Sequence, residues 1–186
     1  MGTIKTTNIE TITGSGTLTL GQSGETISIP SGVTMSVPSG GLSGQNYPAF
    51  FAYLSSSQAV SSATYTKVQI DTKVFDTNGY YDNSTNYRFT PLVAGKYLIF
   101  YGVGLESADG NATSLINELR LNGSRISNGP RLDAAGITRF CAAGTQVVDM
   151  NGSTDYLEVF GYVSGGGTEF NAGDRQTFFG AYRIGV

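Results

Sequence analysis

The segment KYLIFYGVGL, residues 96–105, is nearly all apolar and has the composition of a β-strand. Successive side chains of a strand point to opposite faces, so Tyr97, Ile99 and Tyr101 share one face and Leu98 and Phe100 share the other. Both faces are therefore apolar. A lone antiparallel sandwich exposes one face of each sheet to water. This strand therefore predicts a further layer of protein over its outer side.

Two later segments, 155–163 and 177–186, have the same two-faced pattern. In residues 155–163, Leu157 and Val159 lie on one face and Tyr156, Phe160 and Tyr162 lie on the other. In residues 177–186, Phe179 and Ala181 lie on one face and Phe178 and Tyr182 lie on the other. Another copy of the chain that covers the outer faces would explain all three segments. A homo-oligomer is therefore expected, and the alternative is that the outer tyrosines are exposed to solvent.

Turn signals separate further strand candidates. They are residues 48–54, 64–76, 86–90, 114–123, 137–144 and 145–152. Residues 114–121, SLINELRL, are also compatible with a helical turn. Glycine is abundant, at 26 residues, and charged residues make up only 13% of the chain, which favours β-structure over helix. The spacing of the strands predicts an all-β antiparallel sandwich or barrel.

Composition excludes several classes of function. The 186 residues are enough for about one domain with a small appendage. The net charge of −3 predicts no nucleic-acid binding, and the lack of a long apolar run predicts no membrane insertion. Histidine is absent, which removes catalytic triads and histidine metal sites. Cys141 has no partner for an intrachain disulfide and, among apolar neighbours, is expected to be buried.

Several separated motifs resemble the globular head of complement component one, subcomponent q, in the tumour-necrosis-factor-like superfamily. They are PAFFAY at 48–53, Phe75-Asp76-Thr77, and Phe89-TPLVA-Gly95-Lys96-Tyr97, followed by Tyr101. Ile99 stands where that family usually has Phe. The resemblance covers 48–186 and implies a ten-stranded jelly roll that packs as a tight trimer. The expected core or trimer-interface residues are Phe50, Phe89, Tyr97, Ile99, Tyr101, Phe160, Phe178 and Tyr182.

Residues before the segment PSGGLSGQNYP, 38–48, differ from the rest in having no aromatic side chain. They repeat a short phrase, TISIPSG and then TMSVPSG, and resemble the opening of virion proteins of marine bacteriophages. We expect residues 1–44 to attach to other virion proteins and to form a β-stem, and residues 45–186 to form the head. In this stem, the side chains of Ile27, Ile29, Met35 and Val37 from three chains would pack against one another. The alternative is that this segment is a plain linker.

The loop DTNGYYDNST, residues 76–85, is one candidate contact site for a ligand. Tyr80 and Tyr81 are expected to stack on a sugar, with Asp82 beside them. A calcium site built from Asp76, Asp82 and Asn83 is one alternative, and an ordinary turn is the other. No cofactor is otherwise expected.

Two further segments carry candidate contacts with a receptor. Arg125 and Arg131 lie in an arginine-rich stretch with Arg120 and Arg139, which would suit anionic sugars or phosphates. The alternative is that these arginines are solvated or lie between subunits. Phe170 lies in the glycine-rich loop 165–173, either as an exposed contact or as an anchor to the core.

Three hypotheses for function remain. The leading one is a trimeric phage fibre or spike that binds a host-surface glycan or protein without catalysis. Its location would be the virion, after assembly in the host cytoplasm, since no signal peptide follows Met1. A capsid-decoration, head-fibre or tail-adaptor protein is the first alternative. A polysaccharide depolymerase that uses Asp149, Asp155 or Glu158 is the second.

Overall fold

The computed structural model describes residues 25–33, 48–107, 110–165 and 168–185. The chain divides into two units, residues 1–44 and 45–186. In the first unit, the described residues 25–33 are exposed, Ile27 and Ile29 included, and the Val33 amide donates to the Pro30 carbonyl at 3.2 Å. Met35 and Val37 lie outside the described residues. The β-stem therefore stays a prediction.

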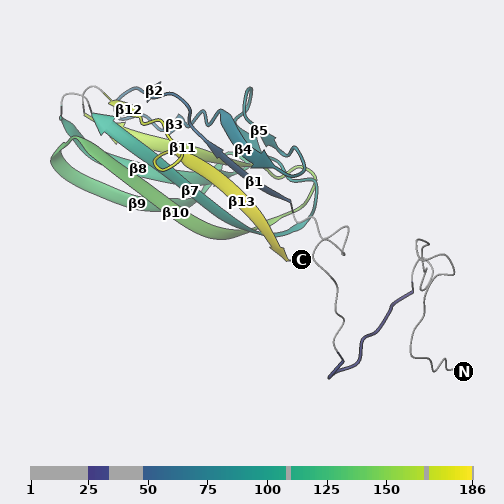
Figure 1. Cartoon of the computed structure of the whole chain (residues 1–186). Coiled ribbons are helices and arrows are strands. Elements are labelled where there is room, and N and C mark those ends of the chain that lie inside the picture. Colours follow the sequence, from purple (N-terminus) through teal and green to yellow (C-terminus); the bar gives the residue numbers. More distant parts are fainter. Residues whose placement is uncertain (1–24, 34–47, 108–109, 166–167, 186) are drawn as a thin grey trace, which may run out of the picture. The chain divides into compact units, whose positions relative to one another are not determined.

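The second unit is a sandwich of two antiparallel sheets (Figure 1). Sheet 1 contains β1 (Ala49–Tyr53), β2 (Gln58–Ala59), β4 (Thr72–Asp76), β7 (Gly95–Ser107), β10 (Arg139–Met150), β12 (Thr168–Phe170) and β13 (Phe178–Gly185). Sheet 2 contains β3 (Thr66–Lys67), β5 (Tyr81–Asp82), β6 (Arg88–Phe89), β8 (Ala112–Leu121), β9 (Ser124–Ile137) and β11 (Leu157–Ser164). The described residues contain no helix long and apolar enough to cross a membrane.

Strand β7 lies at the centre of sheet 1, where it pairs with β10 on one side and with β13 and β12 on the other. Its inner residues Tyr97, Ile99 and Tyr101 are fully buried in the core. Leu98 on the outer face is 39% exposed, and Phe100 is half-buried. The predicted division of this strand into two apolar faces is confirmed.

An aromatic cluster joins the two sheets. The Phe50 ring of β1 is stacked on Tyr81 and Phe89 of sheet 2, with both centroid distances at 4.6 Å. Phe179 of β13 meets the Phe50 ring edge-on at 5.0 Å, and Phe89 meets Tyr97 of β7 at 5.6 Å. Aromatic pairs in these geometries add to the gain from burial alone. The cluster therefore clamps sheet 1 against sheet 2.

The residues expected in the core or the trimer interface fall into two groups. The fully buried ones are Phe50, Phe89, Tyr97, Ile99 and Tyr101. The others lie on outer faces, where Phe160 and Phe178 are half-buried and Tyr182 is 46% exposed. The first group fills the sandwich. In the second group, Phe178 and Tyr182 lie on the outer face of sheet 1, whereas Phe160 lies on that of sheet 2 under the Arg120 guanidinium.

Two predicted strand boundaries are wrong. Residues 64–76 form two short strands, β3 and β4, because the chain crosses from sheet 2 to sheet 1 between them. Residues 137–144 and 145–152 belong to one strand, β10, which continues through Gly144. A Cβ at Gly144 would lie 2.8 Å from the Tyr101 ring, so glycine marks a close approach here rather than a turn. Residues 112–121 form strand β8, so the alternative of a helical turn at 114–121 is wrong.

Other elements are not predicted by the sequence. Strand β9 pairs with β8 and is largely exposed, so its polar residues show no apolar alternation. Strand β12 lies within the predicted flexible loop 165–173, and β5 lies within the loop 76–85. Cys141, expected to be buried, is exposed, because it faces outward from β10 opposite Gly104 of β7.

The aromatic clamp predicts a large loss of stability on substitution of Phe50. Phe50→Ala is expected to lower the free energy of unfolding by about 3–5 kcal/mol, as for other buried Phe→Ala changes. Leu92→Ala, at a side chain that is 59% exposed, is the control and should cost less than about 1 kcal/mol. Urea unfolding followed by circular dichroism measures both. Equal losses in the two variants would contradict the assigned role of Phe50.

Candidate functional site

An open hollow beside the β5–β6 hairpin is the main candidate binding site. Its volume is about 320 Å³. We call it the β5–β6 hollow, and its lining residues are Gly79, Tyr80, Tyr81, Asp82, Asn86, Arg88, Thr90 and Leu92. The hollow combines aromatic, aliphatic, amide, hydroxyl, carboxylate and guanidinium groups, and small-ligand sites typically combine apolar surface with a few polar groups in this way.

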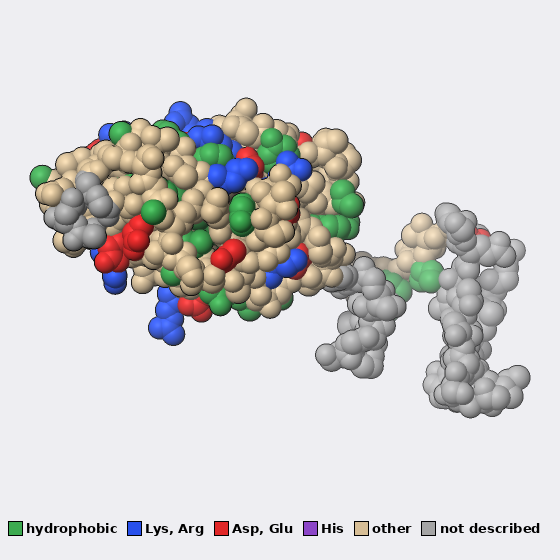
Figure 2. All heavy atoms as spheres, turned by 90° about the horizontal axis from the view of Figure 1, so that it is seen from above, with side chains coloured by type: hydrophobic (Ala, Val, Ile, Leu, Met, Phe, Trp, Pro, Cys, Tyr) green, Lys and Arg blue, Asp and Glu red, His purple; other side chains and the backbone are tan. Residues whose placement is uncertain are grey.

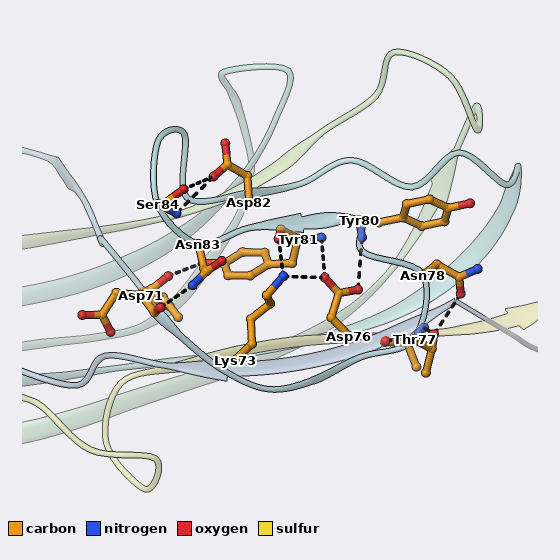
Figure 3. A network of polar contacts seen from close by, with 12 residues as sticks. Asp71, Lys73, Asp76, Thr77, Asn78, Tyr80, Tyr81, Asp82, Asn83 and Ser84 are labelled. Carbon is orange, nitrogen blue, oxygen red and sulfur yellow. Dashed lines mark hydrogen bonds and ion pairs between the residues drawn. The ribbon is translucent and has the colours of Figure 1, made fainter.

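The turn that presents Tyr80 is built by Asp76, the last residue of β4. Its carboxylate accepts hydrogen bonds from the backbone amides of Tyr80 and Tyr81, both at 3.1 Å (Figure 3). Lys73 forms an ion pair with the same carboxylate at 3.3 Å. Gly79 adopts a left-handed backbone with φ of 71°, which glycine tolerates without steric cost. Asp76 is therefore a structural residue that closes this turn.

Tyr80 and Tyr81 have different roles because their rings point in opposite directions (Figure 3). Tyr81 is only 2% exposed, and its hydroxyl donates to the Ile70 carbonyl at 2.8 Å. Burial raises the pKa of this phenol. The prediction that the Tyr81 ring contacts a receptor is wrong, because that ring is stacked on Phe50 in the core. Tyr80 is half-buried and lines the hollow.

Asp82 organises the hairpin loop. Its carboxylate accepts hydrogen bonds from the backbone amides of Ser84, Thr85 and Asn86 at 3.0–3.1 Å. The Thr85 amide is the main cause that holds the pKa of this carboxyl well below 3.8. These bonds satisfy the negative charge within the loop. The backbone at Tyr87, which follows, has φ of 49°, a strained value for a bulky residue that turns the chain into β6.

The calcium alternative is not favoured by these contacts. The carboxylates of Asp76 and Asp82 accept backbone amides, and Asn83 donates its side-chain amide to the Asp71 carbonyl at 2.6 Å. Within the described ranges, no group of three or more acidic, Cys or His side chains is placed to hold a metal ion. The three residues therefore act as hydrogen-bonding groups of the turn and loop.

Arg88 lines the hollow and is a site residue that was not predicted from the sequence. Its guanidinium lies 4.5 Å from the centroid of the Tyr156 ring, a cation–π stack that holds its plane. No carboxylate of the described residues lies within ion-pair distance of it, although Asp82 is its partner across the hairpin. One signal was available, because the inward Phe89 requires the neighbouring Arg88 to point outward.

The predicted arginine patch is a set of ion pairs. Arg120 and Arg125 both contact the buried Glu118, and Arg120 lies 3.7 Å over the Phe160 ring. Arg131 pairs with Asp133, and Arg139 pairs with Glu106 at 2.7 Å. Figure 2 shows one face of the head, where basic and acidic side chains form small groups among mostly uncharged atoms. Arg125 and Arg131 are exposed and each contacts an acidic group, but Arg125 shares Glu118 with Arg120.

The remaining candidates have structural partners. Phe170 is fully buried, so the prediction of a receptor contact is wrong and the alternative of a core anchor holds. Its ring packs over Gly161, where a Cβ would lie 2.5 Å from the ring. Glu158 is paired with Lys67 at 2.5 Å, and Asp155 accepts the Asn151 amide at 2.8 Å. Two of the three carboxylates that were candidates for sugar hydrolysis therefore have polar partners within the protein, and the third, Asp149, is exposed on β10.

Solved structures share this architecture. Murine APRIL at pH 5.0 is 11% identical, with 75% of this chain and the whole of that chain covered at a TM-score of 0.56. The globular domain of zebrafish complement 1qA protein is 15% identical, with 75% and 98% of the two chains covered at a TM-score of 0.51. No family model and no curated sequence matches the chain. The head therefore has a tumour-necrosis-factor-like and complement-like jelly-roll fold.

The lowered pKa of Asp82 predicts a specific dependence of stability on pH. A depressed carboxyl pKa stabilises the fold above the unfolded value, about 4, and this stabilisation is lost as the pH falls below it. Asp82→Asn should therefore be less stable than the wild type at pH 7, and the difference should shrink below about pH 4. Urea unfolding between pH 2.5 and 7 measures it.

Asp174→Asn is the matched control, because it removes an exposed carboxylate outside the hairpin. Its difference from the wild type should vary less over the same range of pH. If the Asp82→Asn difference were constant with pH, the hydrogen bonds in the loop would not depend on the charge of Asp82, and the assigned role would be wrong.

Proposed function

We propose that this chain is a homotrimeric, non-catalytic binding protein of a bacteriophage virion. The head, residues 45–186, binds a glycan or protein of the host cell surface, and residues 1–44 form the stem and attach to other virion proteins. The jelly-roll fold of the head supports a binding module. The resemblance of the opening residues to phage virion proteins supports the virion location.

The outer face of sheet 1 is the observation that carries the trimer. Strand pairing places Val147, Leu98 and Tyr182 side by side across β10, β7 and β13, and these side chains are 50%, 39% and 46% exposed. The next row contains Phe100, Gly180, Phe51 and Phe75 across β7, β13, β1 and β4. Exposed apolar side chains that adjoin one another in this way are typical of protein interfaces.

Two glycines allow aromatic rings to lie against the backbone of this apolar face. The Phe100 ring lies against Gly180, and the Phe178 ring lies over Gly102, where a Cβ would come within 2.6 Å of it. Phe51 lies 6.1 Å from both rings. Rings that lie flat on a sheet offer area with little loss of side-chain entropy on association. The face is therefore suited to packing against another protein surface.

The free edge of β10 is compatible with a ring of copies. Apart from β7, strand β10 pairs with no described strand, so its outer edge lies beside the apolar face. In the proposed assembly the apolar face of one copy contacts this edge of the next, and such a head-to-tail contact forms a ring where the rotation between copies closes. The trimer implied by the resemblance is one such ring.

Leu98 provides the test of the trimer. Leu98→Asp places a charge on the apolar face without touching the core, so it should convert a trimer into a folded monomer of about 20 kDa. Leu92→Asp, at an exposed leucine of the β5–β6 hollow, is the control and should remain trimeric. Sedimentation velocity at several concentrations measures the mass. A monomeric wild type, or a trimeric Leu98→Asp variant, would contradict the proposal.

Cell binding provides the test of the host-surface function. The fluorescently labelled full chain should adsorb to host bacteria, and the Leu98→Asp monomer should adsorb at least tenfold more weakly, because it loses avidity. Labelled protein that coats virions but not bacteria would overturn the receptor function and select a capsid-decoration or tail-adaptor role. Release of reducing sugar from host polysaccharide would select a depolymerase.

A further inference from the structure

We propose that the β5–β6 hollow binds a carboxylate-bearing saccharide, with the sugar carboxylate held by Arg88. This inference rests on the proposed binding function and names the class of ligand and the residue that recognises it. The geometry combines a cation that has unused hydrogen-bond donors, an adjacent aromatic and aliphatic surface, and a rigid hairpin.

Arg88 differs from the other cations of sheet 2 because it has no acidic partner. Lys67 is paired with Glu158, Arg120 with Glu118 and Arg131 with Asp133. Arg125 shares Glu118 with Arg120, at a longer distance of 3.9 Å. The Arg88 guanidinium stacks on the Tyr156 ring, and no carboxylate of the described residues lies within 4.0 Å of its nitrogens. The stack fixes the guanidinium plane and leaves its edge available. A guanidinium edge binds a carboxylate through two parallel hydrogen bonds.

The rest of the hollow fits a sugar ring. Tyr80 is half-buried, and Leu92 is 59% exposed, so both present apolar surface to which the CH groups of a pyranose can pack. Thr90 and Asn86 add a hydroxyl and an amide for sugar hydroxyls. The volume of about 320 Å³ lies near the lower limit of ligand sites, which suits a short saccharide. An inorganic anion would leave the apolar part unused.

Asp82 lines the hollow with a carboxylate that is bound by its own loop. The Ser84, Thr85 and Asn86 amides donate to it at 3.0–3.1 Å, and the Asn86 side chain adds a bond at 2.8 Å. These dipoles oppose the negative charge and weaken, without removing, its repulsion of an anion. The Thr90 amide also donates to the Tyr80 carbonyl at 2.9 Å, which holds the hairpin closed below the hollow. The site is pre-organised, so a ligand loses little affinity to ordering it.

Isothermal titration calorimetry of the full chain with trigalacturonate tests the proposal. Galactotriose is the neutral control, because it lacks the carboxylates. Trigalacturonate should bind at least tenfold more tightly than galactotriose, and Arg88→Gln should remove this preference. Arg88→Lys keeps the charge but loses the planar fork, so it should also bind at least fivefold more weakly than the wild type.

Arg175→Gln is the matched control variant, because it removes one exposed arginine outside the hollow. It should bind trigalacturonate as the wild type does. Equal affinity for the two saccharides, or equal losses in Arg88→Gln and Arg175→Gln, would overturn the proposal. Chemical-shift changes on titration should include Tyr80 and Leu92, and changes confined to other strands would also overturn it.

The outcomes separate this inference from the proposed function. Adsorption to cells with no preference for trigalacturonate would overturn the acidic-sugar site and leave the receptor function standing. Trigalacturonate binding through Arg88 without adsorption would support the site and overturn the host-surface role. Circular dichroism of Arg88→Gln and Arg88→Lys confirms that the loss of binding does not come from unfolding.

Discussion

The stacking of Phe50 against Tyr81 and Phe89 is the interaction on which the rest of the structure depends. It joins β1 of sheet 1 to β5 and β6 of sheet 2, at centroid distances of 4.6 Å. The same contact fixes the site, because Tyr81 can enter the core only if its neighbour Tyr80 faces outward. Phe89 likewise turns Arg88 toward solvent. The residues that hold the fold therefore also aim the residues of the hollow.

A second constraint comes from β7, which supplies side chains to two apolar surfaces. Tyr97, Ile99 and Tyr101 close the sandwich, and Leu98 and Phe100 remain on the outside. The outer surface of sheet 2 is different, since Glu118 and Glu158 are buried there under Arg120 and Lys67. Sheet 2 thus covers part of its outer face with its own ion pairs, whereas sheet 1 exposes apolar side chains on its outer face.

The sequence predicts the parts of the fold that depend on alternation. The two faces of β7, β11 and β13 follow from their apolar side chains, and the jelly roll follows from the motifs around Phe50, Phe89 and Gly95. The edge strand β9 does not follow, because its exposed residues carry no periodic pattern. Gly144 is interpreted as a turn residue from the sequence. In the structure it leaves room for the Tyr101 ring of β7, which a Cβ at this position would contact too closely. Such contacts depend on the pairing of strands distant in sequence.

The candidate site shows the same limit. The sequence of residues 76–85 predicts the region of the hollow and the role of Tyr80. It does not show that Tyr80 faces the hollow while Tyr81 is buried, or that Arg88 lacks an acidic partner. The lack of an acidic partner for Arg88 depends on its stacking with Tyr156 and on the ion pairs that occupy nearby carboxylates, such as that of Lys67 with Glu158. The hollow lies on the β5–β6 hairpin of sheet 2, and the apolar face lies on sheet 1. One copy can therefore use both surfaces at once. In the proposed trimer, three weak hollows would act together on a surface that repeats the proposed sugar.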